Sequence, residues 1–130
     1  MIVLDASIVV ERLTGGPLAR AVREDPALRR DSLIVPHLLD MEVVSAICGM
    51  TAGRRMDAHR ADRILSGLAM MPAERYSHVP LLPRIWELRR NFTAYDAAYI
   101  ALAEATGAIL YTADEKLSKG HRARVVLFRG

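Results

Sequence analysis

Short apolar runs alternate along the chain with longer stretches whose apolar residues recur every three or four positions. The runs are typical of strands buried on both faces, and the wider spacing is typical of amphipathic helices. Strands are predicted at residues 2–4, 32–35, 108–111 and 124–128, with a poorer edge strand at 74–78. Helices are predicted at residues 6–13, 17–24, 38–51, 57–70, 80–90 and 94–105, with a loop at 26–31 and a short helical turn at 114–118.

This alternation of strands and helices predicts an α/β fold, in which a parallel sheet carries helices on both faces. The 130 residues fit one compact domain, spanning residues 1–130. No apolar run approaches the roughly 18 residues of a membrane span. The first residues form a strand pattern that ends in an acid, and they do not resemble a signal peptide.

Cys48 is the only cysteine, which excludes an intrachain disulfide. We interpret it as a small core side chain, and a chain without disulfides fits a cytoplasmic location. The net charge is +3, and arginine outnumbers lysine sixteen to two. Arginine suits phosphate recognition. The basic pairs become a phosphate-binding surface only if they surround one site.

Two acids follow predicted strands. Asp5 comes directly after residues 2–4, and Asp114 comes shortly after residues 108–112. Ligands of open α/β sheets gather beyond the carboxyl ends of the strands. Two further acids, Glu42 and Asp96, lie on apolar faces of predicted helices. A carboxylate in such a place needs hydrogen bonds, a cation or a metal ion.

Taken singly, three of these acids have an ordinary explanation as helix caps. Asp5 suits an N-cap, Asp96 completes a capping box that begins at Thr93, and Asp114 favours a helix N-terminus. Glu42 lies inside a helix, so it either pairs with a buried arginine or belongs to a site. We interpret Asp40, two residues earlier, as a solvated acid.

Taken together, the four acids predict a metal site. Converging carboxylates raise each other's pKa unless a cation is present. An all-oxygen donor set suits Mg²⁺ or Mn²⁺ and not zinc. The histidines are scattered and show no ligand spacing, so we interpret them as surface or structural residues: His37, His59, His78 and His121.

Four carboxylates and one divalent ion leave a net charge of about −2, which repels a phosphate. A second metal ion or basic residues at the rim would offset that repulsion. Either solution is typical of metal-assisted phosphodiester cleavage by an activated water. The hydroxyls of Ser7 and Thr112 lie close in sequence to Asp5 and Asp114, where they orient a carboxylate or a water or, equally well, cap a helix.

Four segments resemble the motifs of PIN domains, most closely those of the VapC toxins of type II toxin–antitoxin pairs. They are Val3-Leu-Asp-Ala-Ser7, Glu42-Val43, Tyr95-Asp-Ala-Ala-Tyr-Ile-Ala-Leu-Ala103 and Thr112-Ala-Asp-Glu-Lys-Leu117. The third is the most specific, and residues 49–84 carry no matching motif. The resemblance implies a three-layer α/β/α domain whose five parallel strands follow the order 3-2-1-4-5.

The same resemblance implies a function and a set of partners. It implies a Mg²⁺- or Mn²⁺-dependent endoribonuclease whose metal-binding and catalytic acids are Asp5, Glu42, Asp96 and Asp114. It further implies an RNA substrate, a homodimer, and a cognate antitoxin through which the toxin meets promoter DNA only indirectly. Because no apolar run is long enough to span a membrane, we expect no membrane among the partners. Glu115 is either an additional acid of the site or, more simply, an acid at a helix start.

Three other interpretations compete with this one. A catalytically idle PIN-type binding scaffold would keep the fold but bind Mn²⁺ weakly or not at all. A receiver-like phospho-acceptor module needs an acidic pair after its first strand, where this chain has Ala6 beside Asp5. That module also needs a lysine after its last strand, which residues 124–128 do not supply. A haloacid-dehalogenase-type phosphatase needs an aspartate where Ser7 stands.

Overall fold

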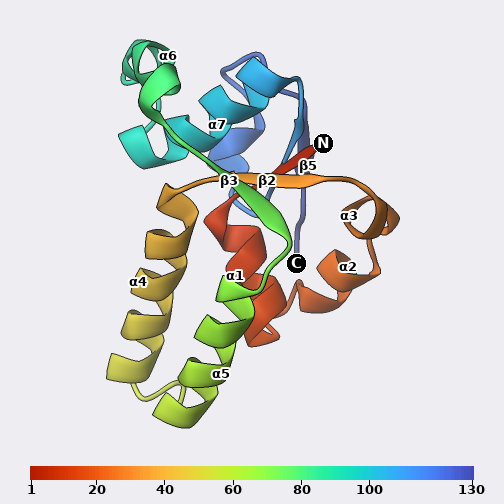
Figure 1. The fold of residues 1–130 in the computed structure, drawn as a ribbon, viewed down its shortest axis with the longest axis vertical. Coiled ribbons are helices and arrows are strands. Elements are labelled where there is room, and N and C mark those ends of the chain that lie inside the picture. Colours follow the sequence, from red (N-terminus) through yellow and green to blue (C-terminus); the bar gives the residue numbers. More distant parts are fainter.

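Five strands form one parallel sheet in the computed structural model, which describes all 130 residues (Figure 1). The strands are β1 (Ile2–Leu4), β2 (Leu33–Pro36), β3 (Ala73–Tyr76), β4 (Ile109–Thr112) and β5 (Val125–Leu127). Their order is β3-β2-β1-β4-β5, and every neighbouring pair is parallel. The predicted strands and the predicted order are confirmed, and β1 lies at the centre of the sheet.

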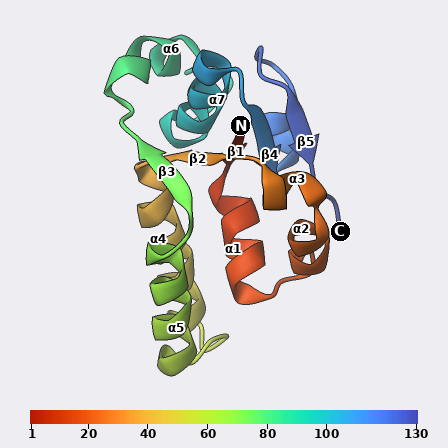
Figure 2. The same ribbon diagram turned by 45° about the vertical axis from the view of Figure 1, so that its right-hand side comes forward.

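Helices cover both faces of this sheet, which confirms the three-layer architecture (Figures 1 and 2). The α-helices are α1 (Ala6–Thr14), α2 (Ala19–Glu24), α3 (Pro26–Arg30), α4 (Leu38–Ala52), α5 (Ala58–Ala69), α6 (Leu82–Glu87) and α7 (Ala94–Thr106). Two 3₁₀ turns, η1 (Val79–Leu81) and η2 (Glu115–Ser118), complete the chain. Helix α7 packs on one face, while α1 and α4 lie on the other and pair with α5.

Two predicted elements differ from the observed ones. The loop predicted at residues 26–31 is helix α3, which Asp25 caps by accepting a 3.1 Å hydrogen bond from the N–H of Leu28. Pro26 occupies the first turn of this helix, where its missing N–H costs nothing. The helix predicted at residues 80–90 is shorter, because the chain first forms η1 and α6 ends at Glu87.

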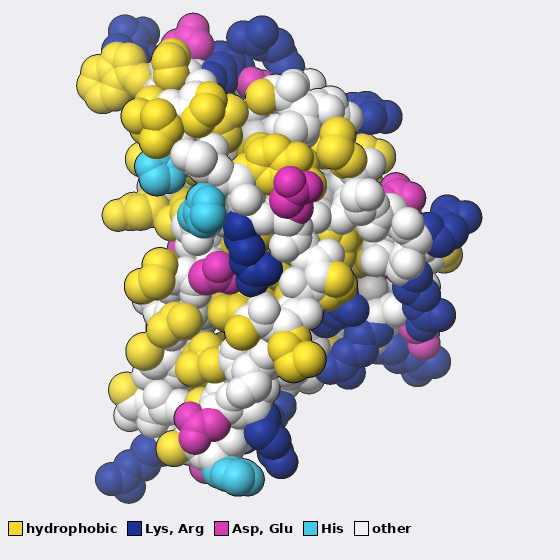
Figure 3. All heavy atoms as spheres, viewed as in Figure 1, with side chains coloured by type: hydrophobic (Ala, Val, Ile, Leu, Met, Phe, Trp, Pro, Cys, Tyr) yellow, Lys and Arg dark blue, Asp and Glu magenta, His cyan; other side chains and the backbone are white.

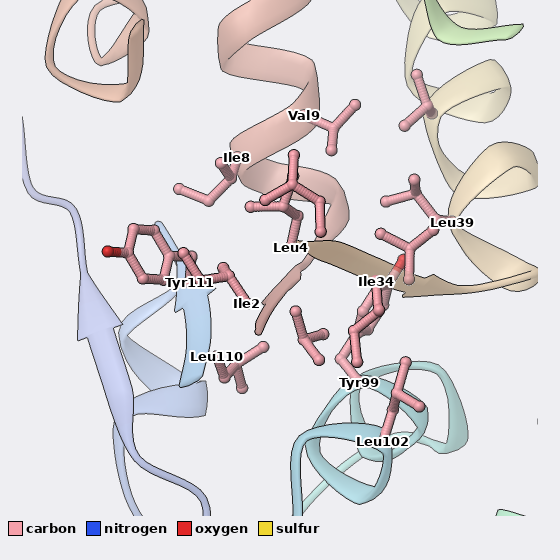
Figure 4. Packing of buried hydrophobic residues seen from close by; sticks show 14 of the residues in the cluster. Ile2, Leu4, Ile8, Val9, Ile34, Leu39, Tyr99, Leu102, Leu110 and Tyr111 are labelled. Carbon is pink, nitrogen blue, oxygen red and sulfur yellow. The ribbon is translucent and has the colours of Figure 1, made fainter. Parts of the chain in front are cut away.

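One cluster of 30 buried residues forms the hydrophobic core. Strand β1 is buried along its whole length, and Figure 4 shows Ile2 and Leu4 among side chains from the neighbouring strands and from α1 and α7. Helix α7 is buried from Ala97 to Ala103. Four of these seven residues are alanines, so the helix lies close against the sheet. This close packing fixes the first turn of α7 relative to the end of β1.

Helices α4 and α5 form a hairpin that extends away from the sheet (Figure 1). Only three residues of α4 are buried, and they are Leu39, Val43 and Ile47. Cys48 is exposed, so its interpretation as a core side chain is wrong. The reason is that α4 has apolar residues all round, whereas its neighbours in the fold cover only one side of it.

Asp40 is not a simply solvated acid, which corrects the prediction. Arg75 of β3 donates to both of its carboxylate oxygens, at 2.8 and 3.0 Å. The same guanidinium donates to the carbonyl of Leu68 at the end of α5. The pair therefore ties α4 and α5 to the edge of the sheet.

None of the helices combines the length and the hydropathy that crossing a bilayer requires.

Candidate active site

Asp5 stands at the carboxyl end of β1 and is 5% exposed. Its Oδ1 accepts hydrogen bonds from the Ser7 hydroxyl at 2.5 Å and from the N–H of Ile8 at 3.2 Å, and its Oδ2 accepts from the Thr112 hydroxyl at 2.5 Å. Asp5 is thus the N-cap of α1, but it is also held from a second strand. Burial raises the pKa of Asp5, hydrogen bonds from Ser7 and Thr112 oppose this, and the charge of Asp114 adds to the rise.

Thr112 links the ends of the two central strands. Its hydroxyl, fully buried, donates to Asp5 and accepts a 2.9 Å hydrogen bond from the N–H of Asp114. Ser7 makes a second link, because its hydroxyl accepts from the N–H of Ala113 at 2.9 Å. Both hydroxyls therefore orient the Asp5 carboxylate, which is the first of the two alternatives that the sequence left open for them.

Asp114 is the N-cap of η2, and its Oδ1 accepts a 3.0 Å hydrogen bond from the N–H of Lys116. The Lys116 ammonium lies 3.9 Å from the other carboxylate oxygen. Asp96 lies in the first turn of α7, where its N–H donates to the Thr93 hydroxyl at 3.1 Å. Burial raises the pKa of Asp96, the charge of Asp114 raises it further, and Lys116 counteracts both. The charge of Asp114 thus acts on both Asp5 and Asp96 across the ends of β1 and β4.

Glu42 has neither a buried arginine nor a histidine as its partner. Its Oε1 accepts a 2.6 Å hydrogen bond from the hydroxyl of Tyr99 on α7. Burial and the adjacent Glu42 carboxylate raise the pKa of Tyr99 far above its usual range, and the charges of Asp5 and Asp96 act in the same direction. Tyr99 therefore stays protonated as a donor, with three of the four acids around its hydroxyl.

Tyr99 was not predicted as part of the site, because the face of the helix that carries Asp96 is otherwise apolar. One signal was available, since Tyr99 follows Asp96 by three positions on the same face of α7. A buried tyrosine hydroxyl needs a hydrogen-bond partner. Its position beside a predicted metal-binding acid therefore indicated a polar partner at the site, although not which residue supplies it.

The donor set of the four acids suits a hard divalent cation. All their donors are carboxylate oxygens, and of the four only Asp114 forms an ion pair with a basic residue. As the side chains stand, no three acids, histidines or cysteines are arranged to hold a metal ion.

Other polar residues are engaged elsewhere. The Glu115 carboxylate pairs with Arg129 at 3.3 Å, and both side chains are exposed. His121 contacts the carbonyl of Leu117 at 2.7 Å and accepts a hydrogen bond from the N–H of Ala123, which is a structural role. These contacts agree with Glu115 as a helix-start acid and with His121 as a structural histidine.

Comparison with known proteins identifies the family. The profile of the PIN domain matches residues 2–122. Ribonuclease VapC9 of Mycobacterium tuberculosis is 39% identical over 124 residues, which are 95% of this chain and 94% of that protein. Ribonuclease VapC12 of the same species is 35% identical over 129 residues, 98% of each chain. The chain belongs to the VapC family of PIN domains.

A solved structure shows the same fold for this VapC-family chain. VapBC2 from Rickettsia felis, bound to a DNA fragment from its promoter, matches with a TM-score of 0.73 over 98% of this chain and 99% of that one. The sequence identity is 13%, so this likeness concerns the fold alone. The predicted family is confirmed, and membership of it excludes the receiver-like and dehalogenase-like interpretations.

Proposed function

We propose that this VapC-family chain is the toxin of a type II toxin–antitoxin pair and cleaves RNA as a metal-dependent endoribonuclease. The observation that carries the proposal is the environment of Asp5. This carboxylate is buried, is fixed by two hydroxyls and has no basic partner. A buried carboxylate without a cation is costly for the fold alone. A ligand that supplies positive charge would offset this cost and so explain a carboxylate at this position. The relatives named as ribonucleases support the same reaction class.

Asp5, Glu42, Asp96 and Asp114 would hold Mg²⁺ or Mn²⁺. When bound, such an ion supplies an activated water near neutral pH and stabilises the charge that develops on the phosphodiester. The protein contributes the orientation of the acids. Ser7 and Thr112 fix Asp5 through their hydroxyls.

Tyr99 fixes Glu42 on α4. Its hydroxyl donates to one carboxylate oxygen of Glu42, and the second oxygen has no hydrogen bond from the chain. Asp5 and Glu42 are thus both presented by neutral hydroxyl donors. Such donors orient a carboxylate without neutralising its charge, so the carboxylate keeps its attraction for a cation.

Lys116 supplies positive charge at the rim of the site. Its ammonium lies beside Asp114 and acts on Asp96, and the side chain is 76% exposed. An exposed ammonium on a flexible stem can turn from a carboxylate to a phosphate oxygen of an incoming RNA. The overall charge of +3 also attracts RNA from a distance.

The partners follow from the proposed role. We expect a cognate antitoxin to bind and silence the protein, promoter DNA to be met only through that antitoxin, and the toxin itself to form a homodimer. An RNA substrate puts the proposed activity in the cytoplasm. The alternative remains an idle scaffold that keeps the PIN fold without cleavage.

The experiment that tests the proposal is digestion of total RNA by the purified protein with Mg²⁺ or Mn²⁺, beside an EDTA control. Asp5→Ala and Asp96→Asn run in parallel, and Asp62→Asn, an exposed acid of α5, is the matched control. Discrete fragments that disappear with EDTA and with the two site variants support the proposal. Intact RNA together with no Mn²⁺ binding in a titration would favour the idle scaffold.

A further inference from the structure

An open hollow of about 290 Å³ borders Glu42. Four of its lining residues come from α4 at positions that share one helix face, and the fifth comes from the first turn of α7. They are Leu38, Met41, Glu42, Ser45 and Tyr95. Three of the five side chains are apolar or aromatic, and Met41 and Tyr95 are 68% and 60% exposed. An apolar hollow therefore opens directly beside one of the four acids.

The Tyr95 ring is largely exposed and does not belong to the hydrophobic core. Its hydroxyl makes no hydrogen bond within the chain, unlike Tyr99 one turn later on α7. Among the phenylalanines, tyrosines and tryptophan, only Trp86 on α6 is comparably exposed. The Arg89 guanidinium covers the Trp86 ring at 4.3 Å from its centroid, and Trp86 does not line the hollow. Tyr95 is thus the aromatic ring that lines the hollow beside Glu42, and its exposed ring is not covered by a cation as that of Trp86 is.

From this geometry, and resting on the proposed ribonuclease function, we infer that the hollow between α4 and α7 is a nucleobase subsite. Tyr95 is the surface on which the base next to the cleaved bond stacks. An RNA whose phosphodiester lies at the acids must place a neighbouring nucleotide beside them. Bases of single-stranded RNA stack on exposed aromatic side chains. Met41 and Leu38 add apolar walls, and the Ser45 hydroxyl offers a hydrogen bond to a base edge.

The charge of the lining residues favours a base over a phosphate as the occupant of the hollow. No lysine or arginine lines the hollow, and its one charged residue is Glu42. A phosphate there would meet repulsion and no counter-charge, whereas a neutral base meets no such repulsion. A second copy of the chain is the competing occupant, because Tyr95 also lines a larger apolar hollow of about 420 Å³ that continues onto Leu82 and Ile85. A protein seated on Tyr95 would bury the Glu42 charge further, which is unfavourable.

The test compares Tyr95→Ala with Tyr95→Phe on an RNA oligonucleotide that carries a cleavage site mapped with the wild-type protein. We expect Tyr95→Ala to lower kcat/KM about tenfold or more, and Tyr95→Phe to stay within about twofold, because stacking needs the ring and not the hydroxyl. An oligonucleotide with an abasic residue on one side of the cut should lose a similar factor with the wild type. For Tyr95→Ala, the abasic oligonucleotide should have nearly the same kcat/KM as the intact one, since the substitution and the missing base remove the same contact.

Trp86→Ala is the matched control, because it removes the other exposed aromatic outside the hollow. Unchanged cleavage by Trp86→Ala, with the molecular mass of both variants equal to the wild type in light scattering, supports the base subsite. A fall in mass for both variants, together with a fall in activity, would assign the face to a second copy and overturn the inference. Wild-type kinetics for Tyr95→Ala on the intact oligonucleotide would overturn it as well.

A failure of the proposed function is distinguishable from a failure of the subsite. If the wild type cleaves no RNA with either metal, the proposed function fails. Binding of a fluorescently labelled single-stranded RNA in EDTA then decides the subsite alone. Weaker binding by Tyr95→Ala than by Trp86→Ala supports it, and equal affinities for Tyr95→Ala and the wild type overturn it.

Discussion

The Tyr99 hydroxyl donates a 2.6 Å hydrogen bond to Glu42, a residue 57 positions earlier in the chain. The two residues belong to α7 and α4, which lie on opposite faces of the sheet (Figure 1). The bond therefore crosses the edge of the sheet and joins the two helix layers at the acids. Tyr99 itself is buried in the core (Figure 4). Its hydroxyl therefore has a fixed position and orients the Glu42 carboxylate.

Replacing Tyr99 by phenylalanine should remove this positioning while keeping the ring in the core. We expect Tyr99→Phe to lower kcat/KM for RNA roughly tenfold and to weaken Mn²⁺ binding, because the Glu42 carboxylate loses its only hydrogen bond from the chain. Stability should change by only about 1 kcal/mol, the typical net value of one hydrogen bond. Steady-state cleavage, Mn²⁺ titration and urea unfolding measure the three effects.

Tyr95→Phe is the control for that experiment, since it deletes a hydroxyl without a partner from the same helix. If Tyr99→Phe and Tyr95→Phe gave the same kinetics and the same Mn²⁺ affinity, the hydrogen bond to Glu42 would have no functional role.

Thr112→Val tests the link between β4 and Asp5. Valine has nearly the same shape as threonine, but it lacks the hydroxyl that donates to Asp5 and accepts from the N–H of Asp114. Because Thr112 and Asp5 are both buried, the Asp5 oxygen that accepts from this hydroxyl is left without a substitute. We expect a loss of about 2 to 3 kcal/mol in the free energy of unfolding and a weaker affinity for Mn²⁺. Urea titration measures the first, and an unchanged midpoint would contradict the structural role of the hydroxyl.

Much of the fold and of the candidate site could be predicted from the sequence, because short apolar runs followed by an acid mark both central strands. Asp5 and Asp114 follow β1 and β4, and the two strands lie side by side in the sheet. Parallel neighbours end at the same edge, so acids placed just after them meet there. This local rule needs no knowledge of distant contacts, which explains why the fold and the candidate acids could be predicted.

The features that could not be predicted depend on contacts between distant segments. Tyr99 and Glu42 are partners only because two helices on opposite faces meet at the sheet edge. Arg75 reaches Asp40 across 35 positions of sequence. Cys48 lies in an apolar run but on a side of α4 that nothing covers. Hydrophobic atoms gather along this side of the molecule and over α6 (Figure 3). Periodicity shows that a helix has an apolar face and leaves open what covers it.

Lys116 should act on the RNA and not on the fold. We expect Lys116→Met to keep the melting temperature of the wild type, because the side chain is largely exposed and its ion pair with Asp114 spans 3.9 Å. Cleavage should become several-fold slower, and its dependence on salt should weaken, with the slope of log kcat/KM against log salt falling by about 0.7 to 1. Kinetics at a series of KCl concentrations give this slope.

Lys119→Met is the matched control, since it removes the only other lysine, which is also exposed. A salt slope that changes equally in both variants would mean that Lys116 contributes only general charge. A slope that changes in neither would remove Lys116 from the RNA-binding surface.

The last prediction concerns acid stability and the pair of Glu104 and Arg84, whose side chains approach to 2.7 Å between α7 and α6. Burial raises the pKa of Glu104, but hydrogen bonds from the Arg84 guanidinium and the N–H of Arg122 outweigh it, so the pKa lies below its usual value of 4.5. A carboxyl with a lowered pKa in the folded state contributes stability above its unfolded pKa and loses it as the pH falls through the folded pKa. The difference in melting temperature between the wild type and Glu104→Gln should therefore be largest above about pH 5 and shrink below pH 4.5. Other titrating acids cancel in this difference, so a gap that stays constant down to pH 3 would show that the Glu104 charge does not stabilise the fold.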